Sequence, residues 1–209
     1  MSTLLRIDSS PFPGEYSFSR QLTAEFAQKW LQTHPDGTVI ARDLALTTLA
    51  PVTVEFITAM HTPEADQTAA HQQALALSDE LIEELLTADE YVFGVSMHNF
   101  SIPSSLKLWL DQIARVGKTF SYATGKPEGL LGGKKATFMV ATGGVYEIGT
   151  PAGAMNFIEP YLRSVFGFLG VTDVTFIYAA GTARARYGVD RSVILQPALE
   201  SIHAQFQTA

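Results

Sequence analysis

The chain has 209 residues, a formal net charge of −7, 46% hydrophobic residues and no cysteine. The length fits one domain and the hydrophobic fraction is sufficient for its core, whereas the negative charge argues against a general binder of nucleic acids or anionic membranes, which needs a basic face. The absence of cysteine excludes disulfides, thiolate catalysis and iron–sulfur ligation through cysteine.

The first half of the chain predicts alternating strands and helices. Apolar periodicity predicts strands at 3–7 and 38–42, helices at 17–33, 54–60 and 72–86, and an irregular segment over 44–68. The N-terminus lacks the basic start and long apolar core of a signal peptide. Because no apolar stretch approaches the roughly 18 residues that span a bilayer, we expect a soluble, cytoplasmic protein.

The second half continues the alternation. It predicts strands at 91–95, 136–141 and 174–179, and helices at 103–115, 157–169 and 191–206. Pro103 is expected in the first turn of its helix, where its missing N–H would have no intrahelical partner. The segment 117–133 holds five glycines and is expected to form a loop excursion.

Strands that alternate with helices indicate an α/β fold, with a parallel sheet between two helical layers. Five strands favour the flavodoxin-like winding, with strand order 2-1-3-4-5, over the six-stranded dinucleotide fold. We therefore expect a single domain over residues 1–209 that forms a flavodoxin-like three-layer sandwich, with excursions at about 44–68 and 117–133. No Gly-x-Gly-x-x-Gly follows the first strand, which leaves a Rossmann NAD domain unsupported.

The loop after the first strand is rich in hydroxyl groups. It holds Ser9, Ser10, Ser17 and Ser19, and Gly14 permits a tight turn. In this winding the loop meets the start of a helix, whose free N–H groups suit a phosphate. A monophosphate site is therefore predicted here. The alternative is that Ser17 or Ser19 only caps the helix.

A second loop joins a buried strand to a helix at the same edge of the sheet. Asn99 lies in it, beside Met97, His98 and Phe100. An amide that donates and accepts, next to apolar and planar groups, suits the rim of a flat heteroaromatic ring such as a flavin. Gly143-Gly144 ends the next strand and can offer N–H groups to that ring, although a plain loop explains the two glycines as well.

Other sites are weakly supported. Gly94-Val-Ser-Met-His98 matches half of the nucleophile elbow Gly-x-Ser-x-Gly, but His98 replaces the last glycine. Gly132-Gly-Lys-Lys135 resembles a P-loop but lacks the Ser or Thr after the lysine. The five histidines are scattered without metal-ligand spacing, so no metal site is expected.

Several motifs, in order along residues 3–206, together resemble the FMN-dependent NADH:quinone oxidoreductase/azoreductase family of bacteria. They are Ser9-Ser10 with Ser17-Phe-Ser19, Met97-His-Asn-Phe100, Leu106-Lys-x-x-x-Asp111 through Ala114-Arg-x-Gly117 and Thr119-Phe-x-Tyr122, Pro127-Glu-Gly-Leu130 with Gly133-Lys-Lys135, and Gly143-Gly144. The sequence departs from the family at His98, where Tyr is common, and at Ala141-Thr142, where Ser and a larger polar residue are common.

The resemblance implies the residues that contact FMN. The implied phosphate contacts are Ser10, Ser17, Phe18 and Ser19, and the implied ring contacts are Met97, His98, Asn99, Phe100, Ala141, Thr142, Gly143 and Gly144. Phe120 and Tyr122, in the glycine-rich excursion, are candidates to cover the ring or a substrate. A local cluster of aromatic residues is the alternative for this pair.

The resemblance further implies a homodimer that binds FMN non-covalently and transfers two electrons from NADH or NADPH to quinones and, by reductive cleavage, to azo compounds. Because the cofactor carries the chemistry, no catalytic side chain is required. One pocket for donor and acceptor predicts a ping-pong mechanism. The charged fraction of 17% is low and fits a subunit interface, although ordinary variation explains it too. The alternatives are an FMN electron carrier without substrate turnover and a regulatory fold that binds no flavin.

Overall fold

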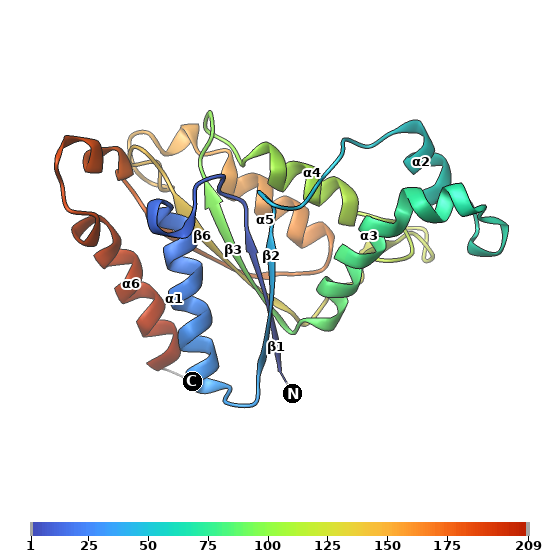
Figure 1. The fold of residues 1–209 in the computed structure, drawn as a ribbon, viewed down its shortest axis with the longest axis horizontal. Helices are drawn as coiled ribbons and strands as arrows, with labels where there is room; N and C mark the ends of the chain where they lie inside the picture. The colour runs from blue at the N-terminus through green and yellow to red at the C-terminus, as the bar shows by residue number, and fades with distance from the viewer. Residues whose placement is uncertain (1, 208–209) are drawn as a thin grey trace.

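Five parallel strands form the central sheet of the computed structural model, which describes residues 2–207 (Figure 1). Their spatial order is β2-β1-β3-β6-β7, which is the predicted flavodoxin-like winding. The strands are β1 (Thr3–Asp8), β2 (Thr38–Asp43), β3 (Glu90–Ser96), β6 (Lys135–Ala141) and β7 (Asp173–Ala179). Because every pair is parallel, all five carboxyl ends meet at one edge of the sheet.

Helices cover both faces of the sheet, as the alternation predicts. One face packs against α1 (Phe18–Thr33) and α6 (Arg191–Gln207), and the other packs against α3 (Ala69–Thr87), α4 (Ser104–Ile113) and α5 (Ile158–Phe168). In β3, Val92 belongs to the first core and Phe93 to the second, and neither is exposed. A strand buried on both faces explains why its sequence is continuously apolar.

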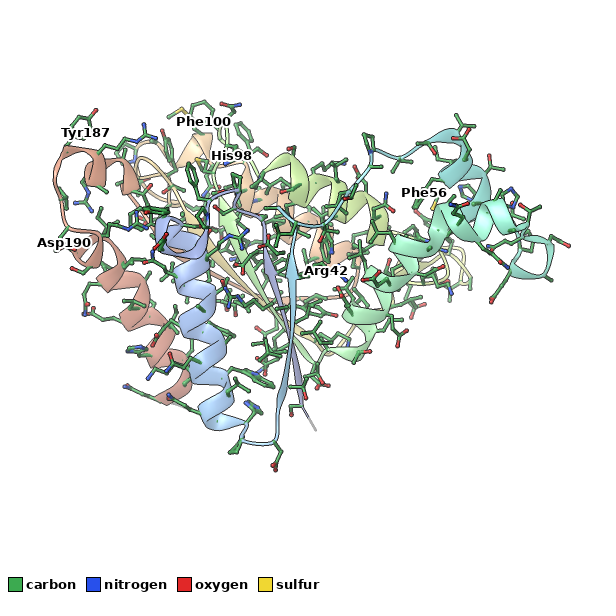
Figure 2. The ribbon with its side chains drawn as sticks, viewed as in Figure 1. Arg42, Phe56, His98, Phe100, Tyr187 and Asp190 are labelled. Atoms are coloured by element: carbon green, nitrogen blue, oxygen red, sulfur yellow. The ribbon has the colours of Figure 1, made fainter. Side chains whose placement is uncertain are left out.

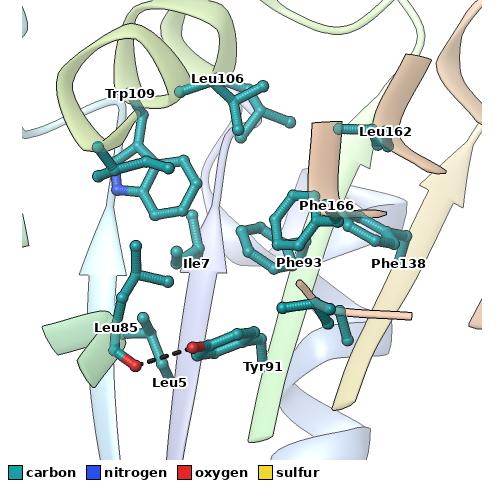
Figure 3. Packing of buried hydrophobic residues seen from close by; sticks show 14 of the residues in the cluster. Leu5, Ile7, Leu85, Tyr91, Phe93, Leu106, Trp109, Phe138, Leu162 and Phe166 are labelled. Atoms are coloured by element: carbon teal, nitrogen blue, oxygen red, sulfur yellow. Dashed lines mark hydrogen bonds between the residues drawn. The ribbon is translucent and has the colours of Figure 1, made fainter. Parts of the chain in front are cut away.

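A group of aromatic rings packs together in the second core (Figure 3). The ring of Phe93 stacks on that of Phe138 at 4.8 Å, and its edge meets Trp109 at 5.5 Å. The hydroxyl of Tyr91 donates to the main-chain oxygen of Leu85 at 2.8 Å, which satisfies this group inside the core. Such rings bury large apolar areas, so this side of β3 and β6 forms a rigid platform below the carboxyl edge.

The first loop excursion carries α2 (Val54–His61) and the short 3-10 helix η2 (Glu64–Asp66). Phe56, which Figure 2 shows on α2, packs with Ala59 and with Leu75 of α3 in a separate small core. The excursion therefore lies on the outer part of α3 and away from the carboxyl edge (Figure 1).

The second excursion contains two short strands that the sequence did not predict, because two residues cannot show a periodicity. They are β4 (Phe120–Ser121) and β5 (Glu128–Gly129), which pair antiparallel. A Cβ on Gly129 would lie 2.1 Å from main-chain atoms of Leu169 and Gly170, so only glycine fits where this sheet meets the turn before β7.

Two helix starts differ from the expectation. Pro103 has an extended ψ of 149° and is the N-cap of α4, so it precedes the first turn and does not lie within it. The helix α3 begins at Ala69, earlier than predicted, because Thr68 and His71 form a capping box.

Within residues 2–207 no helix is both long and apolar enough to cross a bilayer. That the chain is one domain stays a prediction.

Candidate functional site

A cavity of about 490 Å³ opens at the carboxyl edge of the sheet. Its walls come from the loops after β1, β3 and β6, from the 3-10 helix η4 (Thr182–Tyr187) after β7, and from the first residue of α6. The lining residues are Ser10, Phe12, Tyr16, Ser17, Phe18, Ser19, Ser96, Met97, His98, Ala141, Gly143, Thr182, Ala183, Ala185, Arg186 and Arg191. Eight of the twelve predicted cofactor residues are therefore brought together here.

The loop after β1 turns three of its four serines toward the cavity. Ser10, Ser17 and Ser19 line it, and each is nearly inaccessible to solvent. Ser9 does not, because its N–H and its hydroxyl both donate to the carbonyl of Gly94, at 3.0 and 2.7 Å. Ser9 instead joins the end of β1 to β3.

Ser17 is the N-cap of α1, as the capping alternative predicts. Its Oγ accepts from the N–H of Arg20 at 3.4 Å and lies 3.3 Å from the Oγ of Ser19. In the first turn of a helix the N–H groups have no intrahelical acceptor. Those of Phe18 and Ser19 have no acceptor outside the helix among residues 2–207 either. Capping by Ser17 therefore leaves two main-chain donors beside the cavity for an anion.

Arg20 fixes the shape of this loop. Its Nε and Nη2 donate to the main-chain oxygen of Ser10, and Nη1 and Nη2 each donate to Asp43 at 2.6 Å. The hydrogen bond from Arg20 lowers the pKa of Asp43 below its usual value. Sequence analysis missed both residues, because the contact joins positions that lie 23 apart in the chain.

Asp8 lies buried beneath the loop at the end of β1. It accepts from the hydroxyl of Thr23 at 2.7 Å and pairs with Arg6 at 2.8 Å. Burial nonetheless raises the pKa of Asp8, against the opposing effects of Arg6, Thr23 and Arg20. A Cβ at Gly94 would approach Asp8 Oδ1 to 2.7 Å, so glycine there leaves room for the carboxylate.

The loop after β3 is a tight reverse turn. His98 and Ser101 exchange main-chain hydrogen bonds of 2.9 and 3.0 Å, while Asn99 and Phe100 have φ values of 48° and 70°. Two successive positive φ values match a type I′ turn, and a left-handed phenylalanine is strained. Strain of this kind concentrates at functional sites.

The turn brings only some of its residues to the cavity. Met97 and the exposed His98 line it, whereas Asn99 and Phe100 are exposed and do not line it. Figure 2 shows His98 and Phe100 together at the upper end of the molecule, near the corner that Tyr187 and Asp190 flank. The ring of Phe100 meets the edge of Tyr146 at 5.9 Å.

The end of β6 supplies two positions that line the cavity and two that shape the loop. Ala141 and Gly143 line the cavity, and a Cβ on Gly143 would meet nothing closer than 3.9 Å. Thr142 is buried, with its hydroxyl donating to the oxygen of Gly144 at 2.8 Å. A Cβ on Gly144 would lie 3.0 Å from the ring of Tyr146. Thr142 and Gly144 therefore shape the loop and do not line the cavity.

Phe120 and Tyr122 do not line the cavity of their own chain, so their expected role of covering the ring or a substrate stays a prediction. Their rings contact each other at 5.7 Å, and Phe120 packs on Phe168 at the end of α5. The reason is topological, because α4 carries the chain away from the carboxyl edge before this excursion begins. Within one chain they form the local aromatic cluster that was the alternative.

Two arginines complete the cavity. Arg186 and Arg191 line it, and no carboxylate does, although the chain carries a net charge of −7. The guanidinium of Arg191 stacks over the ring of Phe18, with 3.7 Å from its carbon to the ring centroid. Sequence analysis did not consider the segment after the last strand. Because that segment begins at the carboxyl edge of the sheet, its arginines could have been predicted to lie near the ligand.

A second cavity of about 480 Å³ lies at the opposite edge, among the starts of β3, β6 and β7. Glu90 and Asp173 line it together with Lys135, and two carboxylates beside one lysine disfavour a phosphate. The cavity at the carboxyl edge instead offers hydroxyls, free N–H groups and Arg191 beside the start of α1, and Met97, His98 and Gly143 at the ends of β3 and β6. These residues fit a flat ring with a phosphate tail, which is the shape of FMN.

Comparisons with known proteins agree with this geometry. A family model described as flavodoxin-like fold matches residues 2–206. The chain is 55% identical over 203 residues to the FMN-dependent NADH:quinone oxidoreductase of Acidobacterium capsulatum, covering 97% of this chain and 98% of that protein. It is 45% identical over 207 residues to FMN-dependent NADH:quinone oxidoreductase 3 of Burkholderia lata, covering 99% and 100%.

Solved structures of azoreductases are also similar. The azoreductase of Bacillus anthracis strain Sterne matches with a TM-score of 0.87 at 30% identity over all of both chains. The FMN-dependent NADH-azoreductase of Bacillus anthracis strain Ames Ancestor, in complex with FMN, matches with a TM-score of 0.86 at 25% identity over 99% of each chain. The similarity therefore extends over the whole flavodoxin-like fold.

Proposed function

Because the chain belongs to the family of FMN-dependent NADH:quinone oxidoreductases with a flavodoxin-like fold, we propose that the cavity at the carboxyl edge of its sheet binds the FMN. The protein is an oxidoreductase that uses FMN and NADH to reduce quinones and azo compounds. This placement of FMN is supported by the serine loop with its free helical N–H groups, together with a cavity that no carboxylate lines.

The serine end of the cavity binds the phosphate in this proposal. Ser10, Ser17 and Ser19 offer hydroxyls, and the N–H groups of Phe18 and Ser19 point from the positive end of α1. Arg20 holds the main chain of Ser10 in place before any ligand arrives, so less ordering is needed on binding.

The other end of the cavity orients the flat ring. The two-electron chemistry is supplied by FMN when it is bound, and the chain's residues position it and admit the substrates. Met97 and His98 supply one wall, and Ala141 and Gly143 supply the other. Asn99 and Phe100 are exposed and do not line the cavity. Their contribution in this proposal is the tight turn that positions Met97 and His98.

An FMN electron carrier without turnover is the rival function. The full-length similarity to named oxidoreductases favours the enzyme. The test is a visible absorption spectrum of the purified protein, followed by NADH oxidation with benzoquinone as acceptor. The proposal expects a yellow protein that oxidises NADH at a steady rate only when quinone is present. A yellow protein that supports no turnover would identify the carrier, and a colourless protein that does not take up FMN would contradict both.

We infer a ping-pong mechanism from the single cavity at this edge. Both substrates would use the same open side of the ring, so the oxidised nicotinamide must leave before the quinone enters. Parallel double-reciprocal lines at varied NADH and quinone concentrations support this order, and intersecting lines contradict it.

We propose a homodimer in which the aromatic excursion of one protomer approaches the cavity of its partner. Phe100, Tyr122 and Phe157 expose 42%, 54% and 58% of their surfaces, and exposed aromatic side chains often mark an interface. Across such an interface Phe120 and Tyr122 could take the substrate-covering role that they lack within their own chain. Light scattering at micromolar concentration tests this, and a fully active monomer would contradict it.

Two further expectations stay predictions. They are the preference between NADH and NADPH and the cytoplasmic location.

A further inference from the structure

We propose that Arg191 binds the phosphate of the cofactor and makes the site select FMN over riboflavin, the same flavin without phosphate. The inference rests on the proposed function, because it assumes that FMN occupies the cavity at the carboxyl edge. It adds an arginine to a phosphate site in which the sequence suggested only hydroxyls and main-chain amides.

Arg191 is placed beside the serine loop by a contact between two distant helix starts. It is the first residue of α6, and the carbon of its guanidinium lies over the ring of Phe18, the first residue of α1, at 3.7 Å from the ring centroid. Phe18 stands between Ser17 and Ser19, which line the cavity. Stacking uses the flat face of a guanidinium and leaves the N–H groups at its edge free to donate.

One of those N–H groups lacks an acceptor. The Nη2 atom of Arg191 is buried and has no hydrogen-bond partner among residues 2–207. The neighbouring carboxylate of Asp190 is engaged, since its Oδ1 accepts from the N–H and the hydroxyl of Ser192, both at 2.8 Å. A buried, charged donor without a partner is costly, so an acceptor from outside the chain would stabilise it.

The two other buried nitrogens without partners have a different setting. They are the indole Nε1 atoms of Trp30 and Trp109, which are neutral groups inside the two cores. Arg191 alone among the three lines a cavity. Its unpaired donor therefore belongs to a side chain that borders a space that a ligand can enter.

The charge of the lining selects the kind of ligand. The cavity holds Arg186 and Arg191 and no carboxylate, and the positive end of α1 adds to the field. Guanidinium groups match phosphate oxygens in geometry and charge. Arg186 is exposed and can be solvated by water, whereas the buried edge of Arg191 cannot. Arg191 is therefore the residue expected to distinguish a phosphorylated flavin.

The test compares two ligands that differ only in the phosphate. Protein freed of flavin is titrated with FMN and with riboflavin, and binding is followed by quenching of flavin fluorescence. In Arg191→Gln we expect the FMN affinity to fall by about 10- to 100-fold, the effect of losing a hydrogen bond to a charged group, while riboflavin binds as it does to the wild type. Arg191→Lys should lose less, because it keeps the charge.

The matched control is Arg184→Gln. Arg184 lies in the same segment but does not line the cavity, and its Nε donates to the oxygen of Gly181 at 3.2 Å. This variant should bind both flavins as the wild type does. Circular dichroism and the thermal midpoint of each variant report whether the fold is kept.

Three outcomes would overturn the inference. An equal loss for FMN and riboflavin would mean that Arg191 acts only by packing on Phe18. Unchanged FMN affinity with a raised KM for NADH would assign Arg191 to the phosphates of the electron donor. Unchanged values for FMN and NADH would remove Arg191 from the site. A wild-type protein that binds neither flavin would contradict the proposed function itself, and a defect in Arg191→Gln alone would not.

Discussion

Arg20 donates two hydrogen bonds to the main-chain oxygen of Ser10, from Nη2 at 2.6 Å and from Nε at 3.2 Å. The same guanidinium binds the carboxylate of Asp43 at the end of β2. The serine loop after β1 is thereby tied to the end of β2 through a single side chain. A ligand that enters the cavity meets a loop whose shape is already set, which lowers the entropy lost on binding.

The first prediction is that Arg20→Gln weakens both the fold and FMN binding. The substitution removes the donors to Ser10 and the partner of Asp43, which should lower the free energy of unfolding by about 1–3 kcal/mol. Urea unfolding of the flavin-free protein measures this loss, and a flavin titration measures the affinity.

Arg42→Gln is the matched control for this prediction. Arg42 pairs with Glu80 and Glu84 of α3, away from the cavity, so its loss should lower stability without lowering FMN affinity. Equal FMN affinity in the Arg20 and Arg42 variants would show that the Arg20 contact does not shape the site.

The second prediction is that Asp8 and Asp43 change stability with pH in opposite directions. Burial raises the pKa of Asp8 above 3.8, so the folded state holds this proton more tightly than the unfolded state. The contribution of Asp8 to the free energy of unfolding therefore falls as the pH rises from 3.8 through the folded pKa. The hydrogen bond from Arg20 lowers the pKa of Asp43, whose contribution is present above pH 3.8 and is lost as the pH falls through its folded pKa.

Unfolding of the wild type, Asp8→Asn and Asp43→Asn over about pH 3 to 8 tests these signs. The stability difference between wild type and Asp8→Asn should decrease with rising pH, and the difference between wild type and Asp43→Asn should increase. Two differences that change in the same direction would contradict the assignment of opposite pKa shifts.

The third prediction separates folding from binding at Gly143. A Cβ there would meet no protein atom closer than 3.9 Å, so Gly143→Ala should fold normally and gain up to about 1 kcal/mol from the stiffer unfolded chain. The added methyl group occupies space at the ring end of the cavity, and crowding of this kind costs about 1–3 kcal/mol. FMN affinity should fall by about 5- to 100-fold while the thermal midpoint of the flavin-free protein holds or rises. A variant that binds FMN as the wild type does would place the ring elsewhere.

The fourth prediction concerns the turn at Asn99. Asn99→Gly keeps a residue that adopts a positive φ, whereas Asn99→Val forces a β-branched side chain into it, at a cost of about 1–2 kcal/mol. Because Asn99 is exposed and does not line the cavity, the turn is expected to matter more than the amide. FMN titration and urea unfolding should find Asn99→Gly close to the wild type and Asn99→Val weaker in both. An equal loss of FMN affinity in the two variants would assign the role to the amide side chain.

The fold and the serine loop were predictable because their signals are local. Apolar periodicity located the five main strands within one residue at each end. The hydroxyl groups before the first long helix predicted a serine loop that lines the cavity, and its binding of a phosphate stays a prediction. The left-handed φ of Phe100 could not be foreseen, because no residue preference points to it. The turn is set by tertiary contacts, such as the bond from the N–H of Phe157 to the oxygen of Phe100 at 3.1 Å.

The parts that sequence analysis missed depend on contacts between distant positions. Arg20 meets Asp43, and Arg191 meets Phe18, and no local pattern announces either pair. Phe120 and Tyr122 do not line the cavity of their own chain, and their role over the ring or a substrate stays a prediction. Their residue types suit a ring, but their position depends on the direction in which α4 leaves the carboxyl edge.

The most direct test of the proposed phosphate site is the affinity of Ser17→Asp for FMN and for riboflavin. Aspartate caps a helix as well as serine does, so α1 should begin unchanged. Its carboxylate would stand beside the phosphate, and two unit charges about 4 Å apart at an effective dielectric near 20 repel by roughly 4 kcal/mol. We expect FMN affinity to fall by about 1000-fold while riboflavin affinity is kept. Wild-type FMN affinity in a folded Ser17→Asp protein would show that the phosphate does not bind at this loop.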